Sequence, residues 1–102
     1  MDTASQLIHV EHQPSQARLE ALGVPQWPLW TKGISTFPWT YDETETCYLL
    51  EGEVIVTPTG GQPVQFGGGD LVQFPAGMSC TWEIRQLVKK HYTFGDLPLS
   101  DR

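Results

Sequence analysis

The sequence predicts an all-β domain, folded as a barrel or sandwich, with one short helix near its N-terminus. Short strand-like segments are separated by turn residues at regular intervals, as in small all-β folds. Ten Gly and eight Pro supply these turns. A hydrophobic content of 39% over 102 residues is enough for one core.

The N-terminal part, residues 1–32, is expected to hold a strand, a helix and an aromatic segment. Apolar and polar residues alternate within 7–12, which predicts a strand. Residues 13–23 contain good helix formers and end at Gly23, a common helix stop. Residues 25–30 hold two Pro and two Trp. Because Pro lacks a donor N–H, this segment is expected to form an irregular aromatic cover.

Residues 33–94 are expected to form the barrel core, with residues 95–102 as a tail, and 1–102 together as a single domain. The predicted turns lie at Gly52, at 59–61, at 67–70 and at 75–77. Between them we expect strands over 34–41, 45–51, 53–58, 62–66, 70–74, 79–85 and 87–94.

Charge and hydropathy exclude several function classes. The net charge is −6, and an acidic surface repels nucleic-acid phosphates and anionic membranes. Neither a secretory signal nor an apolar run of about 18 residues is present, so we expect a cytoplasmic protein, or one in an organelle lumen if a transit peptide has been removed. Two cysteines are too few for a disulfide framework and are expected to stay reduced.

Two patterns of spaced residues lie within the predicted barrel core. The first is Gly33, Trp39, Tyr41, Glu45 and Gly52, separated by five, one, three and six residues. The second is Gly69, Pro75, Gly77 and Cys80, separated by five, one and two residues. The glycines permit backbone conformations that other residues resist, and Pro75 presets its turn.

In order and spacing, these patterns resemble the two motifs of the cupin superfamily over roughly residues 33–84. The resemblance implies a cupin-type barrel, a double-stranded β-helix or jelly roll. Metal-binding cupins have histidines where this chain has Trp39, Tyr41 and Cys80, and only Glu45 is kept. We therefore expect no metal cofactor. The disfavoured alternative is a divalent metal at Tyr41, Glu45 and Cys80, because Tyr and Cys must lose protons to bind.

The residues around the motifs resemble small cupins grouped with the (S)-ureidoglycine aminohydrolase cupin domain family. The resemblance rests on Phe37–Tyr41, Glu45–Gly52, Gly69–Gly77 and Lys90–Tyr92. Those aminohydrolases bind manganese through a Glu, two His and a Gln. This chain has Glu45 in place of one of those histidines and Cys80 in place of the glutamine, so their activity is not carried over. Cupins also commonly form homodimers, for which residues 7–12 and outward-facing Tyr48 and Leu50 are suited.

Strand alternation predicts which side chains face the interior of the barrel. Residues of one parity from the two motifs and the last strand converge there. We expect aromatic and apolar walls with a few polar groups, which is the usual composition of a ligand pocket. No catalytic residue is assigned. The candidate pocket residues are Trp39, Tyr41, Glu45, Cys47, Cys80, Trp82, Lys90 and Tyr92.

A buried carboxylate needs a partner, and Lys90 or the Tyr41 hydroxyl is expected to supply it for Glu45. The alternative is that Lys89, Lys90 and His91 form a solvated face. Cys80 would act as a nucleophile only if a nearby cation lowered its pKa. Otherwise both cysteines are small buried hydrophobic residues.

Three functions fit this sequence. The first is a metal-free module that binds a small polar metabolite. The second is an enzyme on a small polar or nitrogenous compound, with an atypical metal or with Glu45 and Tyr41 as acid–base groups. The third is a structural role within a complex, which an exposed apolar patch would support.

Overall fold

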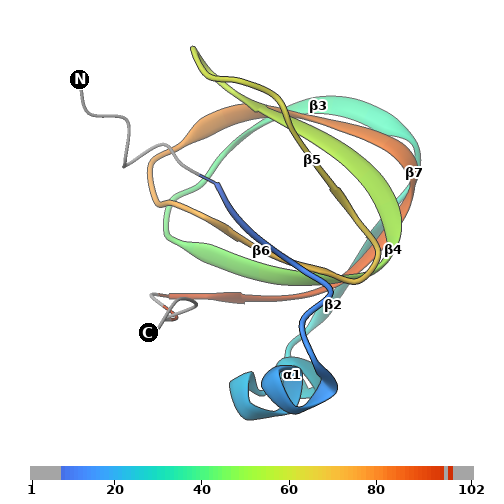
Figure 1. The fold of residues 1–102 in the computed structure, drawn as a ribbon. Coiled ribbons are helices and arrows are strands. Elements are labelled where there is room, and N and C mark those ends of the chain that lie inside the picture. Colours follow the sequence, from blue (N-terminus) through green and yellow to red (C-terminus); the bar gives the residue numbers. More distant parts are fainter. Residues whose placement is uncertain (1–7, 96, 98–102) are drawn as a thin grey trace.

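The computed structural model describes residues 8–95 and 97 (Figure 1). No helix in these residues is both long and apolar enough to cross a membrane. In chain order the elements are β1 (His9–His12), α1 (Gln16–Leu22), the 3-10 helix η2 (Val24–Gln26), β2 (Leu29–Lys32), β3 (Ser35–Thr40), β4 (Glu45–Pro58), β5 (Val64–Gly67), β6 (Asp70–Phe74) and β7 (Ser79–Phe94).

The strands form one antiparallel sheet, which confirms the all-β class with one short α-helix. The strand order is β1-β6-β4-β7-β2, with β3 also paired to β7 and β5 also paired to β4. Pairing among the described residues does not close the sheet into a barrel. Instead, β4 and β7 form its long bent centre (Figure 1).

The two central strands are longer than predicted. We expected a tight turn at Gly52 and a break near residue 86, but β4 and β7 each run through these points. The ladder between them instead shifts register between Leu49 and Val54, as at a β-bulge. Gly52 lies in this irregular stretch with φ 128°. The bulges therefore accommodate the bend without a chain reversal.

The sheet changes partners on either side of this bend. The first residues of β4 pair with β6 and with the end of β7, whereas its last residues pair with β5 and with the start of β7. The predicted turns at 59–61, 67–70 and 75–77 are present and join β4 to β5, β5 to β6 and β6 to β7.

The N-terminal segment adds edge strands and a capped helix. The strand predicted over 7–12 is present as β1, and Leu7 lies outside the described residues. In α1 the Ser15 hydroxyl accepts from the Arg18 N–H, and Gly23 ends the helix at φ 82°. The aromatic cover is only partly irregular, because Leu29 and Trp30 enter β2 and pair with β7. Pro28 precedes this edge strand, so no ladder hydrogen bond is lost.

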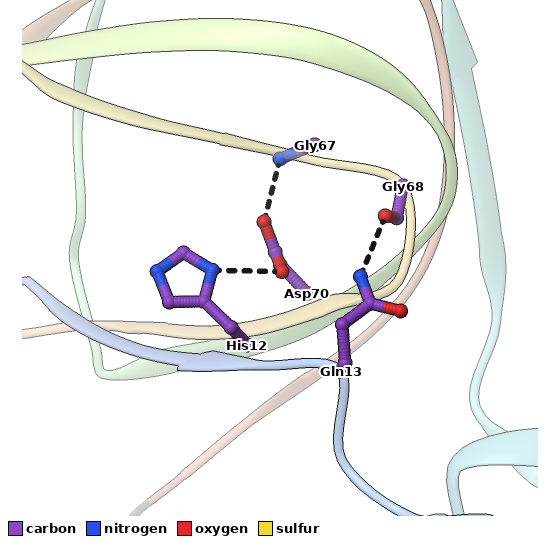
Figure 2. Close-up of polar contacts among 5 residues, drawn as sticks. All are labelled: His12, Gln13, Gly67, Gly68 and Asp70. Atoms are coloured by element: carbon purple, nitrogen blue, oxygen red, sulfur yellow. Dashed lines mark hydrogen bonds and ion pairs between the residues drawn. The ribbon is translucent and has the colours of Figure 1, made fainter.

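The Asp70 side chain connects the end of β1 to the β5–β6 turn through two polar contacts (Figure 2). One of its carboxylate oxygens accepts from the Gly67 N–H at 2.9 Å, and the other lies 3.0 Å from Nδ1 of His12. Gln13 adds a hydrogen bond from its side-chain amide to the Gly68 carbonyl at 3.3 Å. Because Asp70 is buried, these contacts offset the loss of its hydration.

The substitution Gly52→Ala tests the bend in the sheet. A Cβ at Gly52 would lie 2.9 Å from the Leu87 carbonyl oxygen and from Val88 atoms, and φ 128° disfavours any side chain. We expect the free energy of unfolding to fall by about 2 kcal/mol or more, measured by urea denaturation. Gly33→Ala is the control, because no atom lies within 4 Å of its Cβ position. Equal effects of the two substitutions would contradict this role for Gly52.

Candidate functional site

A cavity of about 600 Å³ opens on one side of the sheet. Two edge strands, the residues between β3 and β4, the start of β4 and the inner positions of β7 contribute to it. Most of its lining is aromatic. The lining residues are Trp30, Lys32, Phe37, Pro38, Trp39, Tyr41, Glu45, Trp82, Lys90, Tyr92 and Phe94.

Trp82 organises the aromatic lining. Phe37 stacks on it with ring centroids 6.1 Å apart, and Trp30 meets it edge-on at 6.2 Å. Its indole N–H donates to the Tyr41 hydroxyl at 2.9 Å, which satisfies a buried donor. The backbone of Tyr41 bonds to Gly77 and Met78, so the turn predicted at 75–77 holds this ring in place.

The polar centre of the cavity is an ion pair between Lys90 on β7 and Glu45 on β4. Lys90 Nζ donates to Glu45 Oε2 at 2.8 Å, and each residue is only 5% exposed. The ammonium also lies 4.8 Å from the ring centroids of both Trp30 and Trp82. The expectation that Lys90 turns inward and partners Glu45 is confirmed, and the alternative of a solvated Lys90 is wrong. A carboxylate and two indole faces thus replace the water around this ammonium.

Tyr41 keeps its proton. Burial is the main cause that raises the pKa of its hydroxyl well above the ordinary value, and the nearby Glu45 carboxylate raises it further. The hydroxyl accepts from Trp82. Tyr41 can therefore donate to a ligand but is a poor base.

The two cysteines are buried but do not line the cavity, whereas the other six candidate pocket residues do. Burial raises the pKa of Cys47 to about 12 and that of Cys80 to about 11. The Cys80 thiol lies 3.6 Å from the Trp39 carbonyl oxygen, to which it donates. Neither thiol has the lowered pKa that a nucleophile needs.

Five lining residues were absent from the predicted set: Trp30, Lys32, Phe37, Pro38 and Phe94. Phe37 and Phe94 share strand parity with predicted residues, so the alternation could have included them. Trp30 and Lys32 reach the cavity from β2, a strand that was not predicted because of the neighbouring prolines.

The donor set implied by metal-binding cupins does not fit this site. Within residues 8–95 and 97, no three His, Cys, Asp or Glu side chains gather closely enough to hold a metal ion. Of the alternative ligands, Glu45 is bound to Lys90, and the pKa values of Tyr41 and Cys80 are raised. His12 and His91 contact Asp70 and the Trp27 carbonyl and do not line the cavity.

Several solved structures are similar to this chain. A DUF861 family protein from Thermotoga maritima is 43% identical to this chain, with a TM-score of 0.84. The match covers 87% of this chain and 100% of that protein. A candidate ethanolamine utilization protein Q from Salmonella typhimurium is 28% identical over 63% of this chain and 51% of its own, with a TM-score of 0.57. The EutQ protein of Clostridium difficile is 20% identical over 90% and 71% of the two chains, with a TM-score of 0.58, which bears on the fold alone.

No curated protein matches the chain. The family model described as the EutQ-like cupin domain matches residues 19–92, which include β2 to β6 and all but the last residues of β7. This match includes every residue that lines the cavity except Phe94. The chain therefore belongs to the EutQ-like cupin domain family.

Proposed function

We propose that this cupin domain binds a small organic metabolite in its aromatic cavity, against the Lys90–Glu45 ion pair and without a metal. The observation that carries the proposal is the ion pair itself, which lines a cavity of about 600 Å³. Small-molecule sites typically measure about 300–1,000 Å³ and combine apolar walls with few polar groups. The cavity has both properties.

Access to the cavity supports the same function. Trp39 and Phe94 line it and remain 50% and 53% exposed. Large aromatic side chains at a cavity mouth leave apolar surface in water until a ligand covers them. Lys90 and Glu45 lie deeper, so a ligand would meet aromatic surface first and the ion pair last.

An enzyme remains the second candidate, and one observation favours it. Glu45 Oε2 accepts from Lys90, while Oε1 has no hydrogen-bond partner among the described residues. A cavity-lining carboxylate oxygen of this kind could accept a proton from a substrate. Tyr41 would then act as a donor, since its raised pKa keeps it protonated.

The finer resemblance to the ureidoglycine aminohydrolase cupins stays a prediction, as do the homodimer and the cytoplasmic location. A homodimer would need a surface outside the cavity. Leu50, on β4 and 44% exposed, remains a candidate for that surface.

A thermal-shift screen of small metabolites tests the binding function. A ligand that binds only the folded chain raises its melting temperature. Because Trp30, Trp39 and Trp82 line the cavity, the same ligand should change tryptophan fluorescence. Trp39→Ala should weaken binding about tenfold, since a buried ligand–aromatic contact is lost. Leu50→Ala, which removes a similarly exposed side chain outside the cavity, should leave affinity unchanged. Equal loss in both variants would count against the cavity.

Metal content separates the metal-free proposal from the metalloenzyme alternative. Protein purified without chelator should carry far less than one equivalent of Mn, Fe, Ni or Zn by mass spectrometry. The reason is that the Glu45 carboxylate is already paired with Lys90, and burial keeps the Cys80 thiol protonated with a pKa of about 11. One equivalent of metal that is lost in both Glu45→Gln and Cys80→Ser would overturn this expectation.

A further inference from the structure

The cavity carries more positive than negative charge, although the protein is acidic. The chain has six Lys and Arg against twelve Asp and Glu, for a net charge of −6. Among the lining residues only Lys32, Lys90 and Glu45 are charged at neutral pH, which leaves one excess positive charge. The acidity of the whole chain therefore does not extend to the cavity, and its one excess positive charge favours an anionic ligand.

Lys32 is the cation in the cavity that a ligand can engage. Its ammonium lies 5.2 Å from the centroid of the Phe37 ring, so it is held against the aromatic lining. Among the described residues it has no ion pair, whereas Lys90 is already paired with Glu45. Lys32 is exposed and lies at the end of β2, on the solvent side of the buried pair.

The surroundings of Lys32 favour a flat ligand with one negative charge. Phe37 and Trp39 from β3 and Trp30 from β2 present aromatic surface beside it. Apolar walls lower the local dielectric constant and strengthen an ion pair formed there. A single unpaired ammonium matches one carboxylate. Phosphate sites often lie at a helix N-terminus, and no helix contributes to this lining.

We infer that the cavity selects a small aromatic carboxylate, whose ring lies against Trp30, Phe37 and Trp39 and whose carboxylate pairs with Lys32. This inference rests on the proposed binding function and specifies its ligand class. Charge at Lys32 sets the preference for an anion, and the aromatic lining sets the preference for a ring. The Lys90–Glu45 pair, already neutral as a unit, holds the lining in place.

Three ligands with the same ring and different charge test this inference. Calorimetric titration at low ionic strength would compare phenylacetate, phenylacetamide and 2-phenylethylammonium. We expect phenylacetate to bind about threefold to tenfold more tightly than the amide, and the ammonium compound to bind most weakly. Added salt should reduce the advantage of phenylacetate, because it screens an ion pair near solvent.

Lys32→Gln should remove that advantage, so that phenylacetate and phenylacetamide bind with similar affinity. Lys89→Gln makes the same change in net charge outside the cavity and should keep the advantage. Equal binding of all three compounds, or equal effects of the two variants, would overturn the charge inference while the binding function stands. If none of the compounds binds and the metabolite screen is also empty, both the inference and the proposed function fail.

Discussion

The burial of Lys90 and Glu45 is the interaction on which the site depends. Taking two charges out of water costs several kcal/mol per ion, which only close pairing and further contacts repay. Here the 2.8 Å contact and two indole faces 4.8 Å from the ammonium provide that compensation. Because Lys90 needs both Trp30 and Trp82, the pair positions the aromatic lining as much as the lining shelters the pair. The same groups that make burial tolerable therefore define the shape of the cavity.

The bent sheet brings these groups together. Glu45 and Lys90 lie on neighbouring strands, with Lys90 opposite Leu49, at the end of the β4–β7 ladder before the bulges. Trp82 lies beyond the bend, opposite Val56, yet lines the same cavity. A flat ladder would hold residues eight positions apart on one strand far from each other. The close fit of Gly52 against Val88 permits the bend and so allows Trp82 to reach Lys90.

Residue alternation predicted much of the inner face, and the two spaced motifs predicted a cupin domain but not its EutQ-like family. The alternation identified Glu45, Trp82 and Lys90 because strand periodicity determines which face of the sheet a side chain lies on. The alternation did not determine how deeply each side chain is buried, so Cys47 was assigned to the pocket although it is fully buried and outside the lining. Glycine at 52 is equally compatible with a turn or a bulge, and only the cross-strand neighbours distinguish them. Lys32 was missed because pairing of β2 with β7 depends on the tertiary fold.

The central claim is that Lys90 and Glu45 stabilise the fold as a pair and not as independent residues. A double-mutant cycle of Lys90→Met, Glu45→Gln and the double variant, followed by urea denaturation, measures this coupling most directly. Each single substitution should cost about 3 kcal/mol or more, because it leaves the other group buried without its partner. The double variant should recover about 2 kcal/mol of the summed loss. Additive costs, with a coupling energy near zero, would contradict the account.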